Sequence, residues 1–173
     1  VSSRANYLGL SEHGRYFNIN DPYNLDYVAV NYGDMPAKGL KMEVKLVRFD
    51  WKRTMRKEAN GFYYVSESES IELQRDTITQ QGTPNRFSML LKEAGNYELT
   101  VTMLDGSGSK RTQFSAYGKS VATASSFGVS REGTVNIALD KDSYKVGENA
   151  RILFTAPFSG RMLIDFVALH GHE

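Results

Sequence analysis

The sequence contains no cysteine among its 173 residues. The chain therefore has no disulfide, no thiol nucleophile and no thiolate ligand for a metal. It also lacks any apolar stretch long enough to span a bilayer as a helix. The sequence also has almost no excess of charge of either sign, because it contains 21 lysines and arginines and 20 aspartates and glutamates. This balance disfavours nucleic acid and other polyanions as partners.

Histidine is nearly absent, which limits the catalytic chemistry that the chain could perform. The three histidines are His13, His170 and His172, and no Gly-x-Ser-x-Gly motif accompanies them. His170 and His172 supply only two ligands, which falls short of a metal site. We therefore expect no enzyme activity, no catalytic residue, no metal and no other cofactor.

Alternation of apolar and polar residues is the dominant pattern that is present. In residues 40–49, Leu40, Met42, Val44 and Leu46 alternate with charged side chains, as in a half-buried strand. No segment shows a convincing helical period. Further strands are predicted at residues 16–19, 25–32, 62–65, 70–79, 87–91, 97–103 and 110–117. The number of strands predicts an all-β fold, an antiparallel β-sandwich of the immunoglobulin or fibronectin III type.

Turn-forming residues predict how some of these strands connect. Residues 93–96 separate the strands at 87–91 and 97–103, which we expect to pair as a hairpin. The Gly- and Ser-rich residues 105–109 predict a turn, because their spacing is not that of a phosphate-binding loop. Tyr97 resembles a tyrosine corner, a structural role in which the hydroxyl bonds back to the chain.

The composition changes after residue 118. Residues 119–133 are small, polar and poorly patterned, so we interpret them as a linker between a sandwich at 1–118 and a second unit at 134–173. Three strands in so short a unit form an incomplete sheet with an open edge. We expect that sheet to pack on the first domain or to pair with another copy of the chain.

The second unit has its own strand signals. We predict strands at residues 135–139, 150–156 and 161–169. Pro157 ends the second of these strands, and Gly160 turns the chain into the third. The third run is apolar at nearly every position, which predicts burial on both faces.

Asp140, Asp142 and Glu148 lie between the first two of those strands and allow two interpretations. Clustered carboxylates suit calcium, but Gly147 falls too late for an EF-hand loop. We therefore favour a solvated turn.

Aromatic residues also allow two interpretations. Trp51 and four bases share residues 51–57, which would suit phosphates or an acidic partner, although a solvated strand end or hairpin tip is favoured. The ten tyrosines, the nine phenylalanines and Trp51 could include a platform for sugar rings. Burial in the core is the default for most of them, because each ring covers a large apolar area.

The longest motif is A-L-D-K-D-S-Y-K-V-G-E-N-A-R-I-L-F-T-A-P-F-S-G-R-M-L-I, residues 138–164. Its order, Leu-Asp-Lys-x-x-Tyr-x-x-Gly-Glu before an alternating strand and Ala-Pro-Phe, resembles the start of the bait-region domain of bacterial alpha-2-macroglobulins. Residues 7–10, 30–36, 47–51 and 93–97 are similar to the macroglobulin-like domain that precedes the bait-region domain in this family. The structural positions that we single out are Tyr97, Tyr144, Gly147, Pro157 and Gly160.

This resemblance implies a function for the whole parent protein. Members of the family trap proteases, often through a thioester, but a Cys-Gly-Glu-Gln motif is absent from this cysteine-free chain. The resemblance implies a structural fragment in the periplasm or cell envelope, lipoprotein-anchored in the full-length protein. Proteases would be partners of that full-length protein, and other macroglobulin domains would be neighbours. The alternative is a carbohydrate-binding or adhesin-like sandwich that uses Trp51 and exposed aromatics.

Overall fold

The computed structural model describes residues 5–11, 14–82, 85–118, 126–129, 131, 134–156 and 161–165. Within them the chain forms ten strands and no helix, so the predicted all-β fold is confirmed. The strands are β1 (Asn6–Leu10), β2 (Tyr16–Asn18), β3 (Pro22–Asn31), β4 (Lys41–Glu58), β5 (Gly61–Thr79), β6 (Asn85–Leu90), β7 (Gly95–Met103), β8 (Gly108–Tyr117), β9 (Asn136–Leu139) and β10 (Ile152–Thr155).

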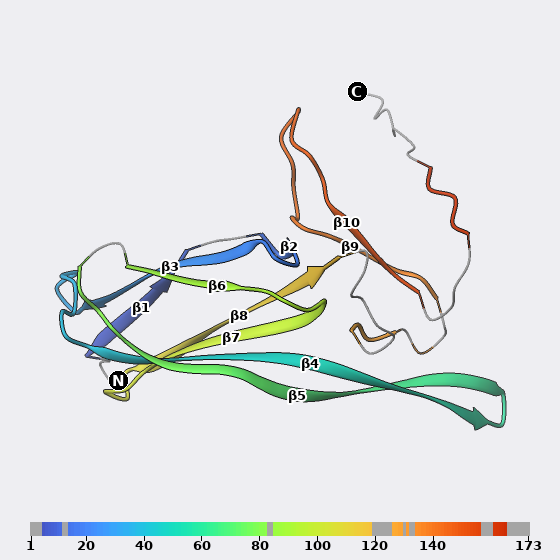
Figure 1. Ribbon diagram of the computed structural model, residues 1–173, viewed down its shortest axis with the longest axis horizontal. Coiled ribbons are helices and arrows are strands. Elements are labelled where there is room, and N and C mark those ends of the chain that lie inside the picture. Colours follow the sequence, from blue (N-terminus) through green and yellow to red (C-terminus); the bar gives the residue numbers. More distant parts are fainter. Residues whose placement is uncertain are drawn as a thin grey trace.

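The first eight strands form a two-layered sandwich, and the last two form a separate hairpin (Figure 1). One layer has the strand order β1-β3-β6, and the other has the order β2-β8-β7-β4-β5. Neighbouring strands are antiparallel except β2 and β8, which pair in parallel.

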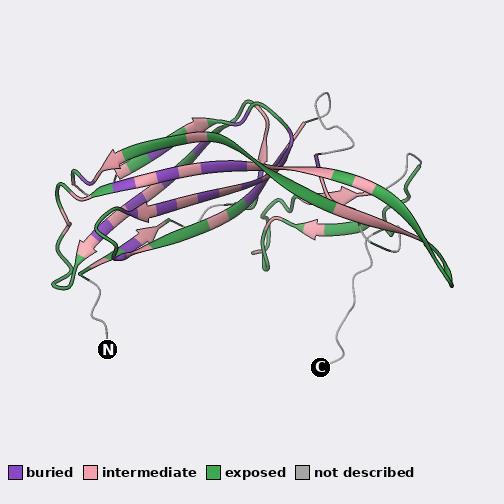
Figure 2. Cartoon of the chain, turned by 90° about the horizontal axis from the view of Figure 1, so that it is seen from below, coloured by how far each residue is buried: buried purple, intermediate pink, exposed green. Residues whose placement is uncertain are grey.

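The core lies between these two sheets (Figure 2). Burial alternates residue by residue along β7, because successive side chains of a strand point to opposite faces. Tyr23, Tyr97 and Leu99 are among the largest fully buried side chains. The ring of Phe114 stacks on Tyr23 at 4.2 Å and on Tyr97 at 5.5 Å between centroids. These aromatic residues therefore belong to the core, as the default interpretation predicted.

The predicted hairpin between residues 87–91 and 97–103 is wrong. β6 pairs with β3 in the smaller sheet, whereas β7 lies between β8 and β4 in the larger one. Leu91 and Ala94 in the connection are buried, so the chain crosses the end of the sandwich instead of turning within one sheet. The predicted turn from β7 into β8 is confirmed, with Gly106 in the left-handed region at φ 80°.

β4 and β5 continue well beyond the sandwich as a two-stranded arm (Figure 1). The two separate strands predicted at 62–65 and 70–79 are one continuous strand, and β4 is longer than predicted. The polar run at residues 66–70 gave no apolar signal, but the backbone pairing with β4 continues through it. Lys52 pairs with Glu69 at 2.9 Å and Arg56 with Glu67 at 3.7 Å. The basic cluster therefore lies on a solvated hairpin arm, as the structural interpretation predicted.

The predicted strand at residues 161–169 is wrong for residues 161–165. These residues form no strand and are exposed, with Leu163 at 95%. No strand in the described part of the chain pairs with them, so their apolar side chains have no layer to cover. Residues 166–169, Pro157 and Gly160 lie outside the described residues, as do all three histidines.

Candidate functional site: the β9–β10 loop and its junction with the sandwich

The loop between β9 and β10 contains the polar half of the motif at residues 138–164. The two strands pair antiparallel, and the Asp140 amide donates to the Arg151 carbonyl oxygen at 3.1 Å to extend the ladder. Gly147 adopts φ +89°, a left-handed conformation that glycine reaches without strain. The loop therefore begins and ends at a paired position, Asp140 and Arg151, and Gly147 lies in the turn between them.

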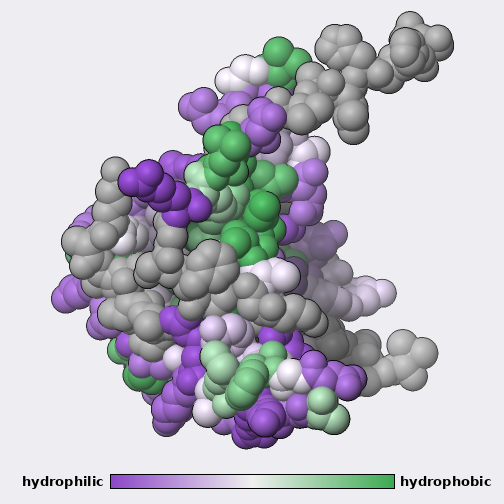
Figure 3. All heavy atoms as spheres, turned by 90° about the vertical axis from the view of Figure 1, so that its right-hand side faces the viewer, coloured by the Kyte–Doolittle hydropathy of each residue, from purple (hydrophilic) through white to green (hydrophobic). Residues whose placement is uncertain are grey.

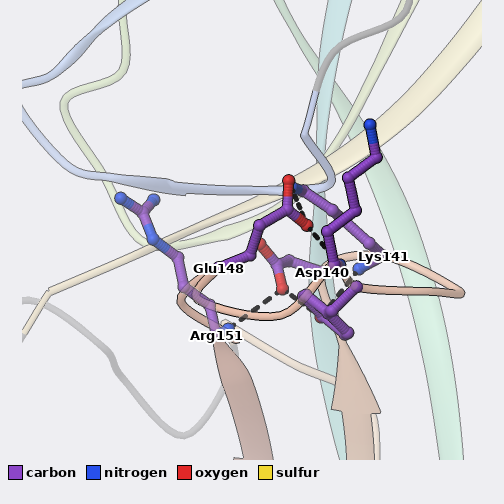
Figure 4. A network of polar contacts seen from close by, with 6 residues as sticks. Asp140, Lys141, Glu148 and Arg151 are labelled. Atoms are coloured by element: carbon purple, nitrogen blue, oxygen red, sulfur yellow. Dashed lines mark hydrogen bonds and ion pairs between the residues drawn. The ribbon is translucent and has the colours of Figure 1, made fainter.

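A hydrogen bond between Asp140 and Tyr144 closes the loop. Figure 4 shows the polar network around Asp140, Lys141, Glu148 and Arg151. The Tyr144 hydroxyl donates to the Asp140 carboxylate and accepts from the Lys141 amide at 3.1 Å. Asp140 Oδ1 also accepts from the Arg151 amide at 3.0 Å, which joins both ends of the loop. The Tyr144 hydroxyl and then the Arg151 amide hold the pKa of the Asp140 carboxyl below its usual value.

Glu148 fastens the other side of the loop. Its Oε2 accepts from the Lys145 amide at 3.1 Å and from Lys141 Nζ at 3.4 Å. The Glu148 amide in turn donates to the Lys145 carbonyl oxygen at 3.0 Å. The Lys145 amide is the main reason that the pKa of the Glu148 carboxyl is lowered. The residue types of the motif thus specify the shape of a loop.

The carboxylates of this loop face protein donors and not a shared centre. Asp140 and Glu148 bind amides of the loop, and Asp142 binds Arg15. Within the residues that the structure describes, no three His, Cys, Asp or Glu side chains are grouped to hold a metal ion. The solvated-turn interpretation agrees with this geometry better than a calcium site.

Two arginines attach the loop to the sandwich. Arg15 Nη1 and Nη2 donate to the two carboxylate oxygens of Asp142 at 3.0 and 2.9 Å, a bidentate pair. Arg151 Nη1 donates to the Tyr16 carbonyl oxygen at 3.3 Å. Arg15 is itself fixed to the larger sheet, because its carbonyl oxygen accepts from the Ser115 amide at 2.8 Å. The hairpin therefore rests on the β2 edge of that sheet through polar contacts.

The described part of the linker lies against the β4–β5 arm. Ser66 Oγ donates to the Val129 carbonyl oxygen at 3.1 Å and lies 3.2 Å from the Val129 amide, which donates to it. The Tyr64 amide donates to the Arg131 carbonyl oxygen at 3.0 Å, and Arg131 pairs with Glu58 at 3.3 Å. The linker thus follows the arm before it reaches β9.

The β9–β10 hairpin exposes an apolar face. The register places Leu139 opposite Ile152 and Ile137 opposite Phe154, so these four side chains share one face. Ile137 is 61% exposed, and hydrophobic atoms gather on this end of the molecule (Figure 3). A two-stranded hairpin is marginally stable by itself, so this face calls for a further layer of protein.

Tyr97 is the one predicted structural position that lies in the sandwich. Its hydroxyl donates to the Glu93 carbonyl oxygen at 2.6 Å, which is the geometry of a tyrosine corner. Tyr144 and Gly147 lie together in the β9–β10 loop, far from Tyr97 along the chain. Sequence reasoning missed Arg15 and Arg151, because isolated arginines carry no pattern that distinguishes an anchor from a solvated charge.

Residues 10–118 match the family model described as bacterial macroglobulin domain 6. The chain belongs to this family. The resemblance to bacterial alpha-2-macroglobulins is therefore confirmed for the sandwich of this macroglobulin domain, whereas the start of a bait-region domain lies outside the match. No curated protein sequence matches the chain.

Solved alpha-2-macroglobulins have the same fold as this macroglobulin chain. The native conformation of the Escherichia coli protein superposes with a TM-score of 0.57 and 16% identity, covering 88% of this chain and 11% of that one. The Salmonella protein reacted with methylamine gives a TM-score of 0.57 and 16% identity, covering 88% of this chain and 10% of that one. The chain thus spans only 10–11% of the length of these neighbours.

Proposed function

We propose that this chain is a scaffold module of a bacterial alpha-2-macroglobulin, a protein that inhibits endopeptidases by trapping them. The observation that carries this proposal is the family match over the sandwich, together with the hairpin docked on its edge. The chain contributes rigidity and position and performs no catalysis. Proteases are then partners of the full-length protein, and other macroglobulin domains are the neighbours of this module.

Residues 134–173 begin the next domain in this proposal, a bait-region type of domain. The motif supports this assignment, and so does the open apolar face of the hairpin, which further strands of that domain would cover. The loop from Asp140 to Glu148 would set the angle between the sandwich and that domain. Pairing of the hairpin with a second copy of the chain remains the other way to cover the face.

A periplasmic or cell-envelope location, with a lipoprotein anchor on the parent protein, completes the proposal. It rests on the family to which the chain belongs. In the described residues no helix is suited to crossing a membrane. Fractionation of cells that express the parent protein tests the location.

A protease-inhibition assay tests the proposed function. We expect the isolated chain to leave trypsin activity unchanged at equimolar and tenfold excess, whereas the parent protein forms a stable complex with the protease. Replacement of Arg15 by glutamate in the parent protein should reduce the trapped fraction, with Lys110→Glu, at an exposed position of β8 in the same sheet, as the matched control. Stoichiometric inhibition of trypsin by the chain alone would overturn the scaffold role.

A further inference from the structure

The four bases in residues 51–57 are divided between the two faces of the β4–β5 arm. Successive side chains of a strand point to opposite faces, so Lys52 and Arg56 lie on one face. Arg53 and Lys57 lie on the other, which we name the basic face of the arm. The cluster that is continuous in the sequence therefore belongs to two different surfaces.

The carboxylates of the arm all lie on the face opposite the basic face, because residues paired across the ladder share a face. They belong to Asp50, Glu58, Glu67 and Glu69. Lys52 Nζ lies 2.9 Å from Glu69 Oε2. Arg56 Nη2 lies 3.7 Å from Glu67 Oε1. The bases of that face are thus balanced by acids, whereas the basic face has two cations and no carboxylate from either strand.

The basic face also presents apolar side chains to solvent. Met55 lies opposite Tyr64, and Lys57 lies opposite Phe62. Met55 is 57% exposed and Phe62 is 69% exposed. The Lys57 ammonium lies 5.9 Å from the centroid of the Phe62 ring, so a cation and an aromatic ring lie side by side. Methionine and aromatic side chains are enriched at protein interfaces relative to other surfaces.

The linker covers the inner part of the basic face and leaves its outer part open. Gly128 packs so closely on the Trp51 ring that an added Cβ would lie 2.9 Å from it. Further along the arm, Ser66 exchanges hydrogen bonds with the backbone of Val129. The exposed apolar side chains lie beyond these contacts, toward the end of the arm. A two-stranded hairpin is marginally stable by itself, which favours a further layer of protein on this side.

From this arrangement we infer that the basic face of the arm docks on a protein surface that carries carboxylates beside apolar side chains. A carboxylate of the partner would pair with Lys57, and apolar side chains of the partner would cover Met55 and Phe62. The arm extends past the sandwich, which makes this face accessible (Figure 1). The docking is separate from the scaffold role, and either can fail without the other.

A protein partner fits the basic face better than a membrane does. Basic clusters that bind anionic lipids typically contain about four to eight lysines and arginines, whereas this face has two. The turn at the end of the arm is polar, with Glu58 and Asn60 exposed. This turn therefore presents no apolar wedge to a bilayer. Exposed apolar side chains between a few charges are instead typical of protein interfaces.

Binding of charged copolymers tests the inference. A fluorescein-labelled copolymer of glutamate and tyrosine would be titrated with the full chain while fluorescence anisotropy is recorded. We expect saturable binding of this copolymer, weaker binding of polyglutamate, and no binding of a copolymer of lysine and tyrosine. Lys57→Gln and Phe62→Ala should each weaken the affinity for the glutamate–tyrosine copolymer about tenfold.

Lys52→Gln is the matched control for Lys57→Gln, because it removes the same charge from the opposite face of the same strand. Leu90→Ala is the control for Phe62→Ala, since Leu90 is exposed on β6 in the smaller sheet. Both controls should leave the affinity unchanged, and circular dichroism should show all four variants folded.

Three results would overturn the inference. The first is no binding of the glutamate–tyrosine copolymer, and the second is an equal loss of affinity in Lys52→Gln and Lys57→Gln. The third is binding to phosphatidylglycerol vesicles without binding to the copolymer, which would indicate a membrane surface instead of a protein.

Discussion

The sandwich and the β9–β10 hairpin are both β-structure, yet different forces hold them in place. The sandwich encloses a core between two sheets, with Tyr23, Leu99 and Phe114 almost fully buried. The hairpin has no fully buried apolar residue in its strands and contacts the sandwich through Arg15 and Arg151. Apolar burial gives stability to the first region, whereas polar bonds give position to the second.

The same substitution should therefore have very different effects in the two regions. Leu99→Ala removes a fully buried side chain between the sheets and should lower the free energy of unfolding by about 2–5 kcal/mol. Leu139→Ala, at a side chain 44% exposed, should change it by less than about 1 kcal/mol. Urea denaturation followed by circular dichroism measures both. Equal losses would mean that the hairpin shares the core of the sandwich.

The tyrosine corner offers a smaller test within the sandwich. Tyr97→Phe keeps the buried ring and removes the hydroxyl that donates to Glu93, so the unfolding free energy should fall by about 0.5–1.5 kcal/mol. Tyr32→Phe is the control, since Tyr32 is 80% exposed. If both variants unfold at the same urea concentration as the unsubstituted chain, the Tyr97 hydroxyl has no structural role.

The loop network should respond locally. Asp140→Ala removes the acceptor of the Arg151 amide and of the Tyr144 hydroxyl, so hydrogen exchange at the Arg151 amide should accelerate several-fold. Asp142→Ala is the matched control, because Asp142 bonds only Arg15 among the partners described. It should leave that exchange rate unchanged. A global fall in protection after Asp140→Ala would show that loop and sandwich unfold together.

Acid should loosen the same loop at low pH. The folded pKa values of Asp140 and Glu148 are lowered, so their contribution is complete above the unfolded values of about 3.9 and 4.3. It disappears as the pH falls through the lower folded values. The Arg151 and Lys145 amide shifts should therefore stay constant down to about pH 4 and move below it. Amide shifts that titrate above pH 5 would contradict this assignment.

The sequence was most informative where burial follows a simple period. Alternation in residues 40–49 and 97–103 predicted β4 and β7, since one face of each is buried. The arm was divided wrongly because residues 66–70 are in β5 through backbone pairing with β4, and an exposed two-stranded ladder needs no apolar pattern. The strand prediction was wrong at residues 161–165 for the opposite reason. These residues have an apolar pattern, but an apolar run forms a strand only where another strand pairs with it.

The candidate site was predicted only in part, for a related reason. The types and order of Asp140, Tyr144 and Gly147 indicated a shaped turn, because these residues bond with one another over a short stretch. Arg15 and Asp142, in contrast, are far apart in the sequence and meet only at the junction with the sandwich. Their proximity depends on how the hairpin lies against β2, which no local pattern contains.

A distance measurement tests whether the loop between β9 and β10 fixes the hairpin at one angle to the sandwich. The chain has no cysteine, so Val146→Cys and Ser109→Cys give two unique sites for spin labels. Double electron–electron resonance should then show one narrow distance distribution. Arg15→Glu should broaden it by repelling Asp142, and adding Asp142→Arg should narrow it again. A broad distribution in the chain with native Arg15 and Asp142, or one that Arg15→Glu leaves unchanged, would show that the loop does not fix this angle.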